Sequence, residues 1–242
     1  MIVETTIHSF SLWHHFAHKP EFGSIAFAEL ARSMDFQGIS LSLNDLNYRH
    51  LGGREIERMD SLRAFLKTHE MSLEIDTSGT TPVHMSEMLK VAHRMGATSL
   101  RTYTTHQGTV GEMMQKTTDD LSMVMQEACD QDVIIVLENH EDFTGPELAE
   151  IVERVNHPNL KILYDYGNSQ MVLEDPLESL EAVLPYVYSI HFKDHVMIRV
   201  EDAGRLTVAG VPVGEGFLPL TEITQRLLKQ GLRRFTFENV WA

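Results

Sequence analysis

The stretch Val133-Ile134-Ile135-Val136-Leu137-Glu138-Asn139-His140 decides the fold. Its five branched apolar residues are typical of a parallel strand that is covered on both faces. Polar groups buried inside such a strand would be costly, so Glu138, Asn139 and His140 are expected at its carboxyl end, where a cavity can open. Because side chains alternate along a strand, Glu138 and His140 share one face and Asn139 points the other way. A single strand of this kind is equally well explained by an exit into a polar loop, so the other strand ends matter.

Seven further segments have strand composition, and seven helical patterns separate the eight strands. The expected strands cover 2–7, 38–43, 71–75, 98–102, 133–137, 161–165, 186–191 and 234–238. The expected helices cover about 24–34, 54–69, 81–96, 111–130, 144–155, 175 onward and 220–230. Such alternation predicts an α/β protein with a parallel sheet, and eight units at this length favour a closed (β/α)₈ TIM barrel. No glycine-rich fingerprint follows the first strand, which disfavours an open dinucleotide-binding sheet.

The alternation runs through 1–242 without a linker-like stretch, which predicts a single barrel domain. The sequence ends four residues after Glu238, so the usual eighth helix is predicted to be missing or vestigial. We therefore expect another subunit, or an N-terminal excursion, to cover 1–7 and the last strand, in a homo-oligomer that is a dimer or larger. The segment 195–216 is a candidate lid with a hairpin around 202–204; a static insert at the oligomer interface is the alternative.

The composition is that of an ordinary globular protein, with 43% hydrophobic and 23% charged residues. No apolar stretch reaches the roughly 18 residues of a membrane span, and the N-terminus lacks the pattern of a signal peptide. The single cysteine, Cys129, excludes an internal disulfide framework and is expected to be an inert core residue of a helix. We therefore predict a cytoplasmic protein with no membrane partner.

The net charge of −15 argues against a protein that binds nucleic acid, because affinity for a phosphate backbone depends on Lys and Arg. The longest basic run is Arg233-Arg234. The 13 histidines and 35 acidic residues are, however, ample material for a site that binds a divalent metal ion.

Barrel enzymes build their active sites at the carboxyl ends of the strands. The last four expected strands end at possible metal ligands, namely Glu138, Asp165, His191 and Glu238. One carboxylate at a strand end is usually a solvated loop residue, but four possible ligands on four neighbouring strands are hard to explain by accident. We therefore predict that these four residues hold one divalent metal ion.

Three carboxylates and one imidazole form an oxygen-rich ligand set. It suits Mn²⁺, the first candidate, and also Mg²⁺, Co²⁺ or Zn²⁺, with positions left for substrate oxygens. An ion held there would polarise the carbonyl of a hydroxy-ketone and stabilise the enediolate that forms when a base removes a proton.

Five motifs together resemble the xylose-isomerase-like TIM-barrel superfamily, which includes sugar isomerases and epimerases, dehydratases, oxo-acid decarboxylases and endonuclease IV. They are Leu137-Glu138-Asn139-His140, Tyr164-Asp165-Tyr166-Gly167-Asn168, Ile190-His191-Phe192-Lys193-Asp194, Val213-Gly214-Glu215-Gly216 and Phe237-Glu238. The resemblance covers essentially the whole chain. It implies that the four matched positions bind one cation and, by likeness to ketose epimerases, that Glu138 and Glu238 act as acid and base.

Two features of the motifs separate the branches of this superfamily. Asn168 stands where endonuclease IV-like proteins and many ketose epimerases have a histidine, and the expected strands two and three end at Asn44 and Asp76 without one. This disfavours DNA repair and weakens the likeness to epimerases. The pair Glu138-x-His140 is similar to the dehydratase and decarboxylase branch, in which the histidine is a candidate for proton transfer.

Several other residues are candidates for the site. His140 is expected to transfer protons or, alternatively, to orient Glu138. Lys193 is expected to face the cavity and bind a substrate carboxylate or enolate oxygen, unless it pairs with a neighbouring acid. Arg101 could clamp a carboxylate or form a salt bridge in the barrel wall.

Substrate contacts are also expected from residues that follow the first and sixth strands. His8 and Trp13, with His14 and His15, could form an aromatic wall for a sugar ring, although packing alone also explains Trp13. Asn168 is a further candidate for binding substrate.

These features predict a metal-dependent enzyme that acts on a small sugar or oxo-acid substrate. A sugar isomerase or epimerase with an enediolate intermediate ranks first, because that chemistry is common in the superfamily. A decarboxylase or dehydratase of an oxo sugar acid, such as a 3-oxo acid or a 3-dehydroshikimate-like compound, follows on account of His140 and Lys193. A catalytically inactive sugar-binding barrel is the remaining alternative; it would require a missing ligand, and none of the four is missing.

Overall fold

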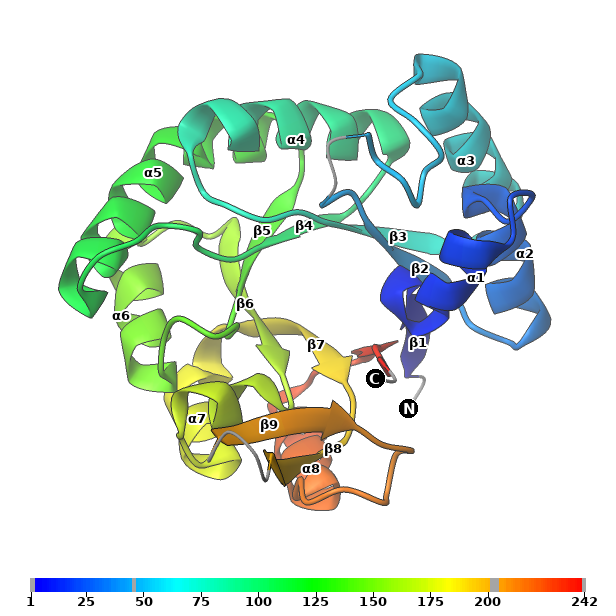
Figure 1. Ribbon diagram of the computed structural model, residues 1–242. Helices are drawn as coiled ribbons and strands as arrows, with labels where there is room; N and C mark the ends of the chain where they lie inside the picture. Colours follow the sequence, from blue (N-terminus) through cyan, green and yellow to red (C-terminus); the bar gives the residue numbers. More distant parts are fainter. Residues whose placement is uncertain (1–2, 45–46, 201–204, 241–242) are drawn as a thin grey trace.

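The structure is a computed structural model that describes residues 3–44, 47–200 and 205–240. Eight strands close into one barrel in the order β1-β10-β7-β6-β5-β4-β3-β2, with helices around the outside (Figure 1). All eight pairings are parallel, which confirms the predicted (β/α)₈ barrel. The strands are β1 (Glu4–His8), β2 (Gly38–Ser42), β3 (Ser72–Asp76), β4 (Ser99–Thr102), β5 (Ile134–Glu138), β6 (Leu160–Asp165), β7 (Val187–Phe192) and β10 (Arg234–Phe237).

The helices match the seven predicted segments and add a short one. They are α1 (Trp13–His18), α2 (Ser24–Ser33), α3 (Ile56–Thr68), α4 (Pro82–Met95), α5 (Val110–Asp130), α6 (Gly145–Val155), α7 (Pro176–Val183) and α8 (Leu220–Gln230). Helix α1 has no counterpart among the predictions, because six residues are too few to show a helical period. Short 3-10 turns occur at η1 (Ser9–Leu12), η2 (Asn168–Val172) and η3 (Leu184–Tyr186).

Local sequence explains where several helices begin and end. A capping box forms at Thr144, where Thr144-Gly145-Pro146-Glu147 has the spacing for one: the Thr144 hydroxyl and backbone N–H both donate to the Glu147 carboxylate. Helix α4 begins with Pro82 and ends at Gly96, whose positive φ of 76° favours glycine. Ser24, where the predicted helix begins, is a residue type favoured at the N-cap, but it is the first residue of α2, and Gly23 takes the cap position without a side-chain hydrogen bond.

The predicted hairpin in 195–216 also forms. β8 (His195–Val200) pairs antiparallel with β9 (Arg205–Gly210), and this two-stranded sheet lies beside α7 and α8 in Figure 1. The proposed tip at 202–204 falls outside the described residues.

One prediction about α5 is wrong. Cys129 is exposed and is not a core residue. The buried face of this helix carries Leu121, Val124, Met125 and Ala128, and Cys129 lies one position further round the helix, facing solvent.

The interior of the barrel is partly polar. Near its centre Thr6 and Thr236 share a hydrogen bond of 2.7 Å, and the buried Glu74 carboxylate accepts hydrogen bonds from Ser99 and Ser189. These residues lie one layer below the strand ends, so the polar column continues into the residues at the carboxyl mouth of the barrel. Of the residues after β10, 238–240 are described and form no helix. No helix among the described residues is long and apolar enough to cross a membrane.

Candidate metal centre

The four predicted metal ligands meet at the carboxyl ends of adjacent strands. Glu138, Asp165 and His191 end or nearly end β5, β6 and β7, and Glu238 follows β10 directly. One ligand atom from each of the four lies within 4.8 Å of the others, and all four side chains are buried. The closed barrel thus brings together residues that are 100 positions apart in sequence.

Nδ1 of His191 is the centre of this cluster. It lies 3.0 Å from Glu238 Oε2, 3.2 Å from Glu138 Oε1 and 3.7 Å from Asp165 Oδ2. A ring nitrogen carries at most one hydrogen, so a single N–H cannot satisfy three carboxylates from three different residues.

Neighbouring charges outweigh burial for His191 and Glu238, whereas burial raises the pKa of Asp165 despite the nearby Lys193. Burial lowers the pKa of His191, but Glu238 and Glu138 outweigh it and raise that pKa well above its ordinary value. Burial raises the pKa of Glu238, but His191, His8 and Lys193 together hold it well below its ordinary value. The negative charge of the acids favours a proton on His191, and the same negative charge favours binding of any cation.

The residues therefore fit a divalent cation. Three carboxylate oxygens and one imidazole nitrogen, all buried and convergent, are donors that Mn²⁺, Mg²⁺, Co²⁺ and Zn²⁺ accept. A cation of charge two would replace the proton on Nδ1 and interact with all three carboxylates at once.

Two cationic side chains lie beside the cluster. Arg101 is buried, forms an ion pair with Glu138 and donates to the carbonyl of Thr77 at 3.3 Å. This is the barrel-wall salt bridge, the second of the two roles predicted for Arg101. Burial raises the pKa of Glu138, but Arg101 and then His191 lower it more, so the carboxylate stays ionised.

Lys193 pairs with two of the four clustered acids. Its Nζ lies 2.8 Å from Asp165 Oδ2 and 3.6 Å from Glu238 Oε2. The same side chain borders a cavity of about 200 Å³ together with Asn168, His195 and Asn239. The predicted Asn168 thus lies beside Lys193, and its backbone N–H donates to Asp165 Oδ1 at 3.1 Å. Lys193 is the link between the acidic cluster and this cavity.

His140 is stacked against a residue that the sequence reasoning missed. Its ring lies 3.9 Å from the ring of Tyr103 at an angle of 6°, and the guanidinium of Arg101 lies 4.8 Å from the same tyrosine ring. Tyr103 is two positions beyond Arg101, so strand alternation could have placed both on the cavity face. Asn139 points away from the cluster, as predicted, and its side-chain amide pairs with the backbone of Asp165.

The residues predicted after the first strand lie in different environments. His8 is buried, pairs with Asp76, and its Nδ1 lies 3.2 Å from Glu238 Oε1. Trp13 is 38% exposed on α1 and stacks on His14 at 3.8 Å. Their expected contacts with substrate stay a prediction. Asp76 is a second residue that the sequence reasoning did not place in the site.

Solved structures with the same fold confirm the architecture. The chain is similar to the IolI protein with a bound zinc atom, with a TM-score of 0.80, 17% identity, and coverage of 98% of this chain and 89% of the other. It is similar to a xylose isomerase-like protein from Mycobacterium smegmatis in complex with magnesium, with a TM-score of 0.71, 18% identity and coverage of 100% and 91%. It is also similar to D-psicose 3-epimerase, with a TM-score of 0.76, 13% identity and coverage of 98% and 84%.

Three curated relatives match at the level of sequence. They are the uncharacterised protein YihM of Escherichia coli, 22% identical over 203 residues; 3-oxo-isoapionate decarboxylase of Pectobacterium atrosepticum, 27% over 160; and 3-dehydroshikimate dehydratase of Bacillus anthracis, 25% over 174. The matches cover 84%, 65% and 65% of this chain. They span 62%, 57% and 61% of the relatives, so the chain spans about three fifths of their length.

The family itself is shown by a match over nearly the whole chain. The family model described as xylose isomerase-like TIM barrel matches residues 12–239, which include all four residues of the cluster. Members of this family are enzymes, among them epimerases and dehydratases. The chain belongs to the xylose isomerase-like TIM barrel family.

Proposed function

We propose that the protein is a divalent-metal-dependent enzyme that forms an enolate from a small polyhydroxylated oxo compound. The observation that carries this proposal is the buried cluster of three carboxylates around Nδ1 of His191, with the ammonium group of Lys193 next to it. The reaction that we favour is dehydration or decarboxylation of an oxo sugar acid.

Glu138, Asp165, His191 and Glu238 would hold the cation. When bound, it supplies a Lewis acid that polarises the substrate carbonyl and stabilises the negative charge of an enolate. Arg101 and His8 contact Glu138 and Glu238 from the side, which keeps these carboxylates ionised and oriented.

Lys193 provides a positive charge for an oxyanion of the substrate. Burial lowers the pKa of Lys193, but Asp165 and Glu238 raise it above its ordinary value, so the amine is protonated at neutral pH. It sits between the acidic cluster and the cavity beside Asn168. The oxyanion is either the enolate oxygen that develops or a carboxylate that does not react, since pairing a departing carboxylate with a cation would slow its loss.

His140 is the proposed proton-transfer group. It lies two residues beyond Glu138, and the stack on Tyr103 holds its ring at a fixed angle. In a dehydration it would remove the proton next to the carbonyl, and in a decarboxylation it would protonate the carbon that loses CO₂.

The lyase is supported by two named relatives, the decarboxylase and the dehydratase, and by Asn168 in place of an epimerase histidine. A sugar isomerase or epimerase is the second candidate. It is favoured by Glu138 and Glu238, which both contact Nδ1 of His191 and could exchange one proton between two carbons.

Incubation of candidate ketoses and oxo acids in D₂O separates the two reactions. Release of CO₂ or water is expected for the lyase. Deuterium at the carbon next to the carbonyl, with the mass otherwise conserved, would instead establish the isomerase or epimerase. Turnover without added Mn²⁺ after complete chelation would contradict both.

The His140→Ala variant tests the assignment of the proton-transfer group. The rate should fall by about 10²–10⁴ while the metal content stays at that of wild type. Loss of metal in this variant would place His140 in support of Glu138 instead. The sugar-binding barrel without activity predicts no stoichiometric metal, so elemental analysis of protein purified without chelators tests it directly.

A further inference from the structure

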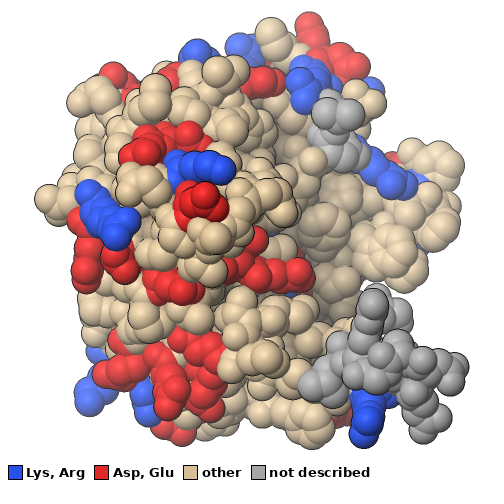
Figure 2. Space-filling model, turned by 60° about the vertical axis from the view of Figure 1, so that its left-hand side comes forward, with Lys and Arg blue, Asp and Glu red and all other residues tan. Residues whose placement is uncertain are grey.

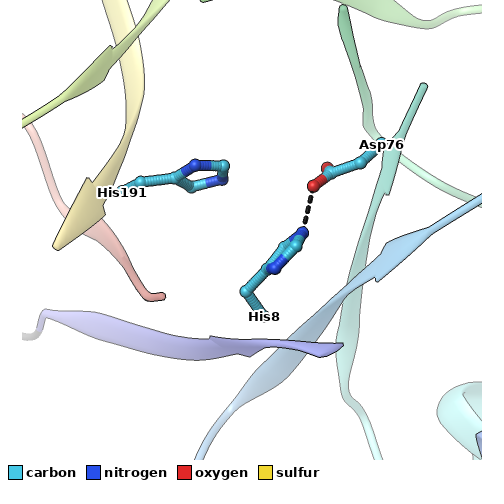
Figure 3. Close-up of side chains that lie close together, drawn as sticks. All are labelled: His8, Asp76 and His191. Carbon is cyan, nitrogen blue, oxygen red and sulfur yellow. Dashed lines mark hydrogen bonds and ion pairs between the residues drawn. The ribbon is translucent and has the colours of Figure 1, made fainter. Parts of the chain in front are cut away.

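A second group of three buried residues lies next to the metal cluster. One of the three, His191, is also a proposed metal ligand, and the other two are not. His8 ends β1, Asp76 ends β3 and His191 lies on β7, so they reach across the barrel from three strands. Ligand atoms of the three lie within 4.8 Å of one another, and all three side chains are buried. In Figure 3 the His191 ring points toward the pair formed by His8 and Asp76.

His191 has one nitrogen that the metal cluster leaves over. Its Nδ1 faces the three carboxylates, and its Nε2 is buried without a hydrogen-bond partner among the described residues. If Nδ1 binds a cation through its lone pair, the ring proton must be on Nε2. A buried N–H needs an acceptor, and a histidine that binds metal usually donates this N–H to a carboxylate or carbonyl.

Asp76 is the candidate acceptor for that N–H. One ligand atom of Asp76 and one of His191 lie within 4.8 Å of each other, and the hydrogen bond between them is the inference drawn below. Asp76 is itself fixed: Ser40 donates to its Oδ1 at 2.9 Å, and its Oδ2 contacts Nε2 of His8.

His8 connects Asp76 with a second proposed ligand, Glu238. Its Nδ1 lies 3.2 Å from Oε1 of Glu238, and its ring centre is 5.2 Å from that of His191. The backbone N–H of Phe10 also lies 3.2 Å from this Nδ1, and it gives up that hydrogen bond when Nδ1 is protonated and donates to Glu238.

We propose that Asp76 is a positioning residue of the metal centre: it accepts the Nε2–H of His191 and, through His8, orients Glu238. Two of the four ligands are thus held from behind by one carboxylate. This inference rests on the proposed metal site.

A second metal ion at His8, Asp76 and His191 fits the contacts less well. His8 already uses Nε2 for Asp76, so an ion there would have to break a contact that the folded chain makes. The three residues are better explained as support for the first ion.

Titration of the metal-free protein with Co²⁺, followed by its visible absorption and by equilibrium dialysis, tests the proposal without any substrate. Asp76→Asn should weaken Co²⁺ binding by about 10–100-fold and alter the absorption band, because the charge that orients His191 is lost. Glu74→Gln is the matched control: it removes a buried carboxylate two residues earlier on β3, which contacts Ser99 and Ser189 instead. It should bind Co²⁺ like wild type.

The outcomes separate this inference from the proposed function. Wild type that binds no Co²⁺ overturns the proposed metal site and this inference with it. Wild type that binds Co²⁺ no more tightly than a folded Asp76→Asn variant overturns the inference alone. A second equivalent of Co²⁺ that disappears in Asp76→Asn also overturns it, because Asp76 would then be a ligand.

Wild-type protein provides a test that holds even if Asp76→Asn does not fold. In the Zn²⁺-loaded protein, histidine-selective ¹⁵N spectra should show the His191 proton on Nε2, protected from exchange with water. A proton that exchanges rapidly with water would contradict the hydrogen bond to Asp76.

Discussion

Glu238 is in contact with more charged groups than its position in the sequence indicates. A nitrogen atom of His191, of His8 and of Lys193 lies within 3.6 Å of one of its two carboxylate oxygens. The carboxylate is therefore ionised, oriented and close to every other part of the proposed site. At the scale of single residues, function follows from neighbours that the fold supplies.

Glu238→Gln should lower turnover by at least about 10²-fold and weaken metal binding, because the amide has no negative charge for the cation. The amide is close in size to the carboxylate, so the fold should persist. Glu29→Gln, an exposed change on α2, is the control and should be neutral. Activity assays combined with metal analysis measure both effects, and near-normal turnover would remove Glu238 from the site.

His195 should make stability depend on pH. Burial, and then the positive charge of Lys193, lower its pKa from 6.5 to about 4. Between these two values the unfolded chain takes up a proton that the folded chain does not, so the free energy of unfolding falls as the pH drops from 6.5 to 4. Above pH 6.5 the full stability is present.

The expected loss is about 2 kcal/mol after allowance for solvent screening. Urea unfolding at several pH values measures it in the chelated protein, for wild type and for His195→Gln. The variant should show a shallower dependence over this window, and an equal dependence would contradict the assignment to His195.

At the scale of elements, Asp194 fixes the loop between β9 and α8. Its carboxylate accepts hydrogen bonds from the backbone N–H groups of His195, Gly214 and Gly216 at 2.9 Å each. The segment after the hairpin is thus tied to the strand that carries His191. Asp194 therefore has a structural role.

Gly216→Ala should destabilise the protein by about 1–3 kcal/mol, because a Cβ at this position would overlap the Asp194 carboxylate and the His195 carbonyl. Gly111→Ala is the matched control. It lies in α5 with open space around its Cβ, so alanine should stabilise the helix by about 0.5–1 kcal/mol. Chemical denaturation of both variants measures the sign of the change in the free energy of unfolding. An equal change in the two variants would contradict this explanation.

At the scale of the whole molecule, acidic side chains outnumber basic ones. Figure 2 shows several large groups of Asp and Glu on one face, with smaller groups of Lys and Arg scattered among them, in keeping with the net charge of −15. A surface of this charge repels a phosphate backbone, and the expectation that nucleic acid is no partner stays a prediction.

Metal binding should stabilise the whole fold, because four strands contribute ligands. At about 100 times the dissociation constant, a bound ion adds about 2.7 kcal/mol, which for a chain of this size raises Tm by roughly 5–10 °C. Thermal unfolding with Mn²⁺ or Co²⁺, against EDTA, measures the shift. The Glu238→Gln variant should lose most of it, and an unchanged Tm in wild type would argue against the site.

The predicted homo-oligomer stays a prediction. A groove of about 460 Å³ lies at the amino ends of β1, β7 and β10, beside α8, and includes Glu4, Tyr188 and Leu232. This is the region over which contact with another subunit is expected. Sedimentation velocity over a range of concentrations tests the expectation, and a monomer throughout would refute it.

The sequence by itself determined the eight-fold alternation, the closed barrel and the meeting of the four residues predicted as ligands. Apolar runs of period two, helical periods and caps are local properties, and in a parallel barrel every strand end falls on one rim, so Glu138, Asp165, His191 and Glu238 had to be neighbours. The exposure of Cys129 was missed because the pattern of α5 leaves positions at the edge of its buried face undecided.

Only the tertiary structure decided which side chains support the ligands. The pairing of Arg101 with Glu138, the stack of Tyr103 on His140 and the contact of His8 with Asp76 each join residues from two different strands or strand ends. Such contacts depend on how far each strand is staggered around the barrel and on the direction of each side chain within it. Neither quantity is written in the local pattern of residues, because both are set by closure of the sheet.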